Sequence, residues 1–275
     1  MEKIEFRKVR DFGDLLNTTF AFIRQNFKKL FLSLLFIAGP AIFLTGIAAG
    51  FYQSNIFSLR SSFGSFIPSA LIYYFFIFIS FQLILTVTYS YINLYLEKKT
   101  DEFDVNDEFD VNDVWENVKK NLLMVLLTTV GISIILVFAT ILLIIPGIYL
   151  GIIFTIIYIV RIQEKLSFFD SISRCKYLMS GNWWFTFALL LIFTVIQYFF
   201  TFLFLIPQYI AMFIGLLHMQ NGQISFDRTL MTVTSIIASI SYFFYAIVLI
   251  GISLHYFSLV EKKEAAGLME KLETI

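Results

Sequence analysis

Residues 141–184 read ILLIIPGIYLGIIFTIIYIVRIQEKLSFFDSISRCKYLMSGNWW, and this stretch decides the fold. An apolar helix is predicted to stop at Pro146-Gly147, because the two residues favour a tight turn. A second apolar helix then runs back to Arg161. An amphipathic helix is predicted from Ser167 to Gly181, because Ser167 begins a capping pattern and glycine is typical of a helix end. The stretch therefore predicts a membrane hairpin followed by a helix on the membrane surface.

The composition extends this pattern to the whole chain. Hydrophobic residues make up 59% of the 275 positions, compared with roughly 45–50% in soluble domains. The apolar runs reach the ~20 residues that a transmembrane helix needs. The sequence therefore predicts an all-α, polytopic membrane protein with a single integral membrane domain over residues 1–275. Six transmembrane helices are expected over residues 30–52, 68–96, 121–145, 148–160, 182–206 and 230–260. They form three hairpins, each preceded by a cytoplasmic amphipathic interfacial helix, and the span at 148–160 is short for a bilayer.

The positions of lysine and arginine predict the orientation. Eighteen of the 20 lie in segments that six spans would place on one side, and only Arg60 and Arg228 lie on the other. Under the positive-inside rule, both termini are therefore cytoplasmic. The predicted cytoplasmic segments are an amphipathic N-terminus, an acidic loop, an amphipathic helix and a charged tail, at residues 1–29, 97–120, 163–181 and 261–275. Abundant Phe and Ile indicate an AT-rich bacterial source, and the expected location is the bacterial inner membrane.

The sequence contains two internal repetitions, and only one of them is long enough to indicate a repeated fold. The hexapeptide EFDVND occurs twice in succession over residues 102–113, which is too short for a fold repeat and indicates a lengthened, solvated loop. A longer pattern places an acidic residue eleven or twelve positions before an Asn that opens an apolar run, at Asp14 and Asn26, Asp110 and Asn121, and Asp170 and Asn182. This spacing favours three copies of an interfacial helix plus hairpin around a common pseudo-axis. The alternative is that any hairpin protein places polar residues before its spans.

The residues around the quoted stretch resemble those of a bacterial membrane-protein group. Pro146-Gly147 lies between two spans, Glu164 follows the second, and Ser173, Gly181 and Trp184 precede the next. The group contains the membrane domain of glycerophosphoryl diester phosphodiesterases and the YciC-like inner-membrane proteins. The resemblance is best over about residues 140–185, and it implies a six-span fold. It implies no phosphodiesterase activity, because six spans in 275 residues leave no room for a catalytic barrel.

One predicted span has a polar face. Gln82, Thr86, Tyr89 and Asn93 recur at helical spacing. Such a stripe could line a solute path, but groups of this kind more often form hydrogen bonds to neighbouring helices. The packing interpretation is therefore favoured, and transport is kept as an alternative.

An ion pair is predicted where the fourth span ends. Arg161 and Glu164 are three residues apart, a spacing at which side chains on a helix meet. Charges near lipid depth are rare and often functional. Anchoring of a helix end is the favoured interpretation.

The sequence shows no catalytic constellation. His218 and His255 are too few and too far apart for a metal site, and the single Cys175 excludes an intramolecular disulfide. No Gly-rich phosphate loop, nucleophile elbow or HExxH motif is present. We therefore expect no enzyme activity, no metal, no cofactor and no nucleic-acid partner.

Three classes of function are compatible with these features. The leading hypothesis is a non-enzymatic subunit or scaffold of a membrane complex, because charges concentrate on one predicted face. Its partners would be membrane lipids and other membrane or cytoplasmic proteins, with Trp115, Trp183 and Trp184 in an interfacial aromatic belt. The first alternative is a small transporter or lipid-handling protein. The second is an intramembrane lipid-modifying enzyme, which would need Arg161, Glu164 and His255 in one pocket. The oligomeric state does not follow from the sequence.

Overall fold

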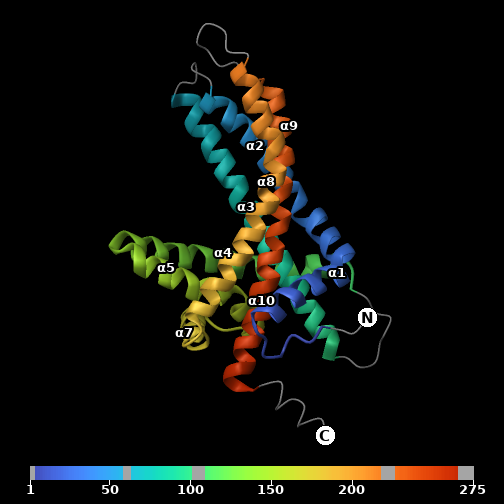
Figure 1. Ribbon diagram of the computed structural model, residues 1–275, viewed down its shortest axis with the longest axis vertical. Helices are drawn as coiled ribbons and strands as arrows, with labels where there is room; N and C mark the ends of the chain where they lie inside the picture. The colour runs from blue at the N-terminus through green and yellow to red at the C-terminus, as the bar shows by residue number, and fades with distance from the viewer. Residues whose placement is uncertain (1–3, 58–62, 101–108, 218–226, 266–275) are drawn as a thin grey trace. The chain divides into compact units, whose positions relative to one another are not determined.

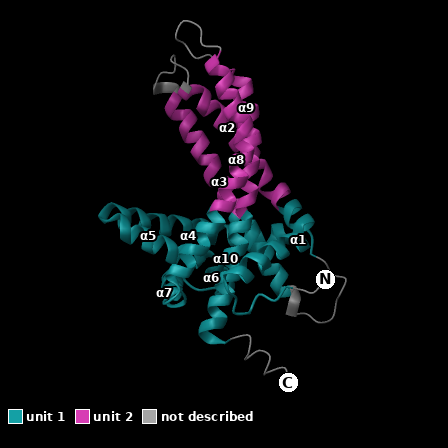
Figure 2. Cartoon of the chain, viewed as in Figure 1, with its two compact units in different colours: residues 1–33, 85–194, 246–275 teal, residues 34–84, 195–245 magenta. Residues whose placement is uncertain are grey.

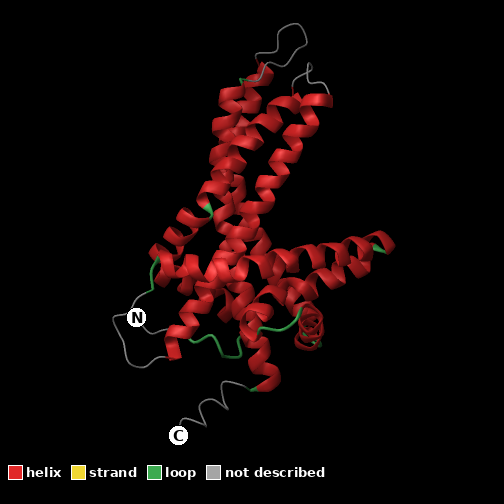
Figure 3. Cartoon of the chain, turned by 180° about the vertical axis from the view of Figure 1, so that it is seen from behind, coloured by secondary structure: helices red, strands yellow, loops and turns green. Residues whose placement is uncertain are grey.

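The computed structural model describes residues 4–57, 63–100, 109–217 and 227–265. Within these ranges every regular element is a helix, as Figures 1 and 3 show. The helices are α1 (Phe12–Ile37), α2 (Gly39–Phe57), α3 (Phe63–Thr100), α4 (Val111–Leu142), α5 (Ile144–Ile153), α6 (Ile157–Glu164), α7 (Phe168–Met179), α8 (Trp183–Leu217), α9 (Arg228–Ser239) and α10 (Tyr245–Glu264), with the 3₁₀ turns η1 (Phe154–Ile156) and η2 (Ile240–Phe244). The predicted all-α class is therefore confirmed.

The helices have the length and composition of membrane spans. Five segments are long and apolar enough to cross, namely Phe66–Glu97, Val111–Leu142, Ile144–Glu164, Trp183–Leu217 and Arg228–Glu264. A sixth is the pair α1 and α2, which is bent by 56° where they meet. The bend falls at Gly39-Pro40, because proline cannot donate a backbone hydrogen bond within a helix and so favours a kink. Five to six candidate spans indicate a multi-pass membrane protein.

The chain divides into two compact units, which Figure 2 shows in different colours. Unit 1 comprises residues 1–33, 85–194 and 246–275, and unit 2 comprises residues 34–84 and 195–245. Charge is distributed very unevenly between them. Of the 20 basic and 20 acidic residues of the chain, only Arg60, Asp227 and Arg228 belong to unit 2. Unit 1 is therefore the charged part of the molecule.

Unit 2 contains a close contact between α2 and α9. The small residues Gly46 and Gly50 of α2 face α9, and a Cβ added at Gly50 would lie 2.4 Å from the Thr232 Cα. A Cβ added at Gly46 would lie 2.6 Å from the Ile236 Cα. Only glycine allows the two backbones to approach this closely. Gly46 and Gly50 are four residues apart, a GxxxG spacing that places both on the face of α2 that contacts α9.

The turn of the α4–α5 hairpin differs from the prediction. α4 ends at Leu142, and the single extended residue Leu143 (φ −157°, ψ 137°) connects it to α5. The turn therefore comes before Pro146-Gly147. Pro146 lies in the first turn of α5, where a backbone N–H has no partner within the helix and proline is tolerated. As a result, the returning helix covers Ile144–Glu164, which is 21 residues and not the short span predicted at 148–160.

Side-chain caps fix the starts of α7 and α4. Ser167 caps α7: its hydroxyl accepts from the Asp170 N–H at 3.3 Å and donates to the Asp170 carboxylate at 2.5 Å. Gly181 has φ +78°, as expected of a residue that ends a helix region. Asp110 caps α4 in a reciprocal capping box with Asp113.

The acidic segment is therefore shorter than predicted. Residues 97–100 and 111–120 of the predicted loop are helical. Residues 102–108 of the duplicated hexapeptide lie outside the described ranges.

Candidate functional site

The strongest polar site of unit 1 is a charged cluster of Glu164, Arg174, Tyr256 and Glu264. Arg174 Nε donates to both carboxylate oxygens of Glu164, at 3.0 and 2.8 Å. Its Nη2 donates to Glu264 Oε2 at 2.9 Å, and its Nη1 donates to the other oxygen of Glu264. The Tyr256 hydroxyl donates to Glu164 Oε1 at 2.8 Å. One guanidinium thus ties α6, α7 and α10 together.

The charged cluster is stronger than a surface ion pair. The side chains of Arg174 and Glu164 are only 20% and 22% exposed, so solvent and salt screen them weakly. Arg174 binds both carboxylates through several N–H groups, which is the strong geometry for arginine. The hydrogen bond to Glu264, with that to Glu164, raises the pKa of Arg174 above its usual value. The guanidinium therefore stays charged at any physiological pH.

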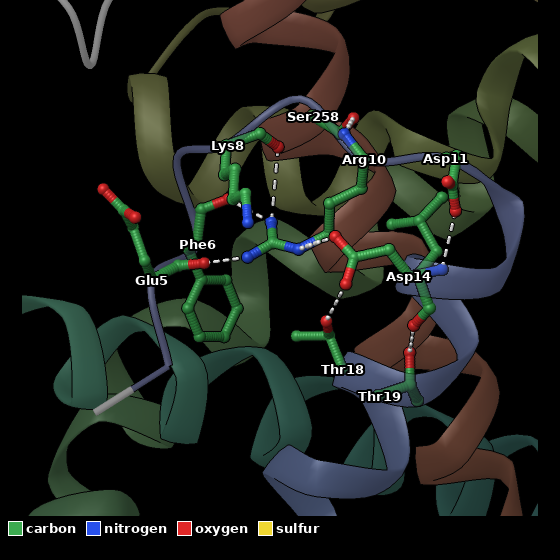
Figure 4. Close-up of polar contacts among 10 residues, drawn as sticks. Glu5, Phe6, Lys8, Arg10, Asp11, Asp14, Thr18, Thr19 and Ser258 are labelled. Atoms are coloured by element: carbon green, nitrogen blue, oxygen red, sulfur yellow. Dashed lines mark hydrogen bonds and ion pairs between the residues drawn. The ribbon is translucent and has the colours of Figure 1, made fainter. Parts of the chain in front are cut away.

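A second polar site surrounds Arg10, as Figure 4 shows. The Arg10 side chain is 3% exposed. Its guanidinium donates to the backbone carbonyls of Phe6 at 2.8 Å and Lys8 at 3.3 Å, and to that of Glu5. Its Nε lies 3.5 Å from the Asp14 carboxylate, one turn into α1. Burial lowers the pKa of Arg10, and Asp14 opposes that effect.

The Arg10 site holds the N-terminal segment against the helices of unit 1. The Arg10 N–H donates to Ser258 Oγ of α10 at 3.0 Å, and the Ile4 N–H donates to the Tyr95 hydroxyl of α3 at 3.1 Å. Phe6 between them is fully buried, and its ring packs against those of Phe22, Tyr95 and Phe257 at 5.4 to 5.7 Å. The segment is therefore an integral part of unit 1.

The predicted ion pair between Arg161 and Glu164 is not formed. In the described part of the chain, Glu164 pairs with Arg174. Arg161 instead donates to the Thr128 hydroxyl of α4, and its guanidinium lies 5.9 Å from the centre of the Phe168 ring. The helical spacing was correct, but α7 folds back after Ser167 and brings Arg174 to Glu164. Such a contact between two elements does not follow from spacing along one helix.

The predicted polar stripe divides between the units, since Gln82 belongs to unit 2 and the other three residues to unit 1. Thr86 and Tyr89 are fully buried, and the Tyr89 ring stacks on that of Tyr158 at 6.5 Å. Asn93 is half-buried and accepts a hydrogen bond from Gln163 at 3.0 Å. In unit 1, therefore, the stripe packs against the α6 helix.

The remaining residues of the family pattern, Ser173 and Trp184, lie on α7 and at the start of α8. Ser173 is exposed on α7 and donates to the Phe169 carbonyl at 3.3 Å. Trp184 is 75% exposed at the start of α8. The neighbouring Trp183 donates from its indole N–H to the Tyr149 carbonyl at 3.2 Å and stacks on the Tyr149 ring. These aromatic residues form an outward-facing group, as expected near a membrane surface.

His255 and Cys175 carry reactive side chains, and both are buried. His255 is 2% exposed, and its Nε2 lies 2.8 Å from the Thr186 hydroxyl. Cys175 is fully buried on α7, and burial raises the pKa of its thiol to about 12. The thiol is therefore inert at neutral pH. His218 lies outside the described ranges.

The described residues contain no group of three or more His, Cys, Asp or Glu side chains placed to hold a metal ion. Comparison with known proteins found no match to a family model, a curated protein or a solved structure. The family resemblance of residues 140–185 therefore stays a prediction. The sequence analysis did not identify the Arg10 site or the role of Arg174, because Arg10 follows Arg7 and Lys8 and nothing in the local pattern sets it apart from them.

Proposed function

We propose that the protein is a non-enzymatic subunit or scaffold of a membrane complex and binds partner proteins through the charged face of unit 1. One observation carries this proposal: all but three of the chain's charged residues belong to unit 1, where Arg174 joins several of them into one cluster. Lys262 extends this surface by donating to Asn182 Oδ1 at 2.8 Å. A fixed set of charges is suited to selecting a partner by electrostatic complementarity.

The exposed part of this surface lies on α7. Lys176 is exposed, and Tyr177 is 46% exposed. The Tyr177 ring lies between two cations, 5.6 Å from the Arg174 guanidinium and 5.2 Å from Lys263 Nζ. Tyrosine and arginine together are typical of the energetic centre of a protein interface. Lys176 and Tyr177 are therefore the proposed contact residues.

The two alternative functions have weaker support. A transporter would need a path along the polar stripe, but Thr86 and Tyr89 are fully buried against neighbouring side chains. An intramembrane enzyme would need Arg161, Glu164 and His255 to converge. Their hydrogen-bond partners differ: Arg161 binds Thr128, Glu164 binds Arg174 and Tyr256, and His255 binds Thr186. Packing within the protein therefore accounts for the polar stripe and for these three residues without transport or catalysis.

The proposed topology has both termini in the cytoplasm of a bacterial cell. The sequence predicts six crossings, two of them by the hairpin that α4 begins. Two of the three repeated asparagines support a common plan, since Asn26 accepts from Tyr91 at 3.2 Å and Asn182 accepts from Lys262. Tyr91 lies on α3 and Lys262 lies on α10, and each of these helices would be the second helix of its hairpin.

Replacing Lys176 with glutamate is expected to release the partner. A charge reversal on the exposed side of α7 should weaken binding by about tenfold, or ~1.4 kcal/mol. The measurement is the amount of each co-purifying protein, by mass spectrometry, after purification of the full chain from its native membrane in mild detergent. Arg228→Glu is the matched control, because it reverses a charge in unit 2 and should leave recovery unchanged. Equal loss in both variants, or no stoichiometric protein in any sample, would refute the proposal.

A further inference from the structure

The half of the α4–α5 hairpin that includes its turn is apolar and exposed. No Asp, Glu, Lys or Arg occurs between Lys120 and Arg161. The five residues around the turn, 141–145, are each 68% to 81% exposed. Within unit 1, Figure 2 shows the hairpin extending sideways from the direction of α10. Something apolar must cover this hairpin in the membrane.

A charged helix lies against the near part of the hairpin. α7 contacts α5, η1 and α6, and it carries Asp170, Arg174 and Lys176 within twelve residues. A helix with three charges cannot lie in the hydrocarbon core without large cost, so it marks the membrane surface. The parts of α5 and α6 that it contacts are therefore close to that surface.

Two contacts of α4 place it beside the same membrane surface. Arg161, which must reach polar surroundings, donates to the Thr128 hydroxyl. A Cβ added at Gly131 would lie 2.6 Å from the Phe168 ring, at the start of α7. Gly131 is eleven residues from the end of α4, which corresponds to about 16 Å of helix. That length is roughly half of the ~30 Å hydrocarbon core.

The contact of Trp183 with Tyr149 also places α5 close to the membrane surface. Trp183 is the first residue of α8 and lies four positions after Met179, the last residue of α7. Tyr149 is five residues from the start of α5, or about 8 Å of helix. The turn at Leu143 is thus too close to the surface marked by α7 and Trp183 to reach the opposite surface of the bilayer.

We infer that the α4–α5 hairpin does not cross the membrane and is embedded in one leaflet, where phospholipid acyl chains cover its exposed apolar residues. This inference rests on the proposed topology for the identity of that leaflet, which is the cytoplasmic one. Four crossings remain, by α1 and α2 together, by α3, by α8, and by α9 and α10 together. An even number keeps both termini on one side, as lysine and arginine predict. Lipid is the occupant because the hairpin lacks the polar rim that a protein interface has.

Single cysteines at the hairpin tip test this inference. Ile145→Cys is the main variant, because Ile145 is 81% exposed and its replacement removes little packing. Leu142→Cys, at 77% exposed, repeats the measurement if the first variant does not fold. Ser173→Cys on α7 reports the cytoplasmic face, and Arg228→Cys reports the outer face. The wild-type chain gives the background, because Cys175 is buried and unreactive.

The readouts are sidedness and depth in the full chain. A membrane-impermeant maleimide is applied to whole cells and to inverted membrane vesicles, and a bimane label at residue 145 is tested for quenching by phospholipids with brominated acyl chains. We expect residue 145 to react about tenfold more slowly than residue 173 or 228 from either side, because the thiolate is disfavoured in hydrocarbon. We also expect strong quenching by the brominated lipids.

Two results would overturn the inference. Rapid reaction of residue 145 from the outer face, like that of residue 228, would show that the hairpin crosses. Rapid reaction from the cytoplasmic face without quenching would show that the tip lies in water or against protein. If residues 173 and 228 react from the same face, the proposed topology is wrong, while quenching at residue 145 still decides whether the tip is in lipid.

Discussion

Replacing Arg10 with alanine is expected to lower the free energy of unfolding by about 3 kcal/mol. The substitution removes the donor for three backbone carbonyls, those of Glu5, Phe6 and Lys8, and the charge that faces Asp14. Buried carbonyls without a partner are costly, since they have also lost their water. The N-terminal segment should then detach and expose Phe6. Thermal and denaturant unfolding of the purified chain in detergent measures the change.

Lys8→Ala is the matched control for Arg10→Ala. Lys8 has an exposed side chain in the same segment, and the substitution leaves its backbone carbonyl in place. Its expected effect is within about 0.5 kcal/mol, as for most surface substitutions. Equal stability of the Arg10→Ala variant and the wild type would contradict the description of the Arg10 site.

Replacing Gly50 with leucine is expected to separate α2 from α9 and to cost about 3 kcal/mol or more. The new Cβ would lie 2.4 Å from the Thr232 Cα, and a backbone atom cannot move aside as a flexible side chain can. The two helices must therefore move apart and lose the packing between them. The change in unfolding temperature in detergent, with the monodisperse fraction after purification, measures this effect.

Gly151→Leu provides the control for helix glycines in general. A Cβ added at Gly151 would meet nothing within 4 Å, and leucine is a better helix former than glycine by up to about 1 kcal/mol. This variant should be as stable as the wild type or more stable. Similar losses at both glycines would contradict a specific contact between α2 and α9.

Local sequence signals predicted much of the fold. The apolar runs marked the long helices, and Ser167 marked the start of α7. These features depend on a few neighbouring residues, so spacing and backbone chemistry suffice. The turn before Pro146 was misplaced because proline is equally compatible with the first turn of a helix.

The polar sites were harder to predict because they depend on long-range contacts. Glu164 and Glu264 are one hundred positions apart, yet both bind Arg174. Arg10 looked like one of several basic residues in a solvated N-terminus, whereas packing of Phe6 buries the segment. The sequence indicates which residues are charged, but the packing of α7 and the N-terminus decides which of them meet.

The most direct test of the central claim is photo-crosslinking in the native membrane. A benzophenone amino acid at Tyr177, on the charged face of unit 1, is compared with the same substitution at Tyr198, which is 67% exposed on the apolar α8 of unit 2. We predict that residue 177 forms a discrete adduct with another protein and that residue 198 forms adducts with lipid. Lipid adducts at both positions, or the same protein adduct at both, would contradict the proposal that the charged face binds a partner.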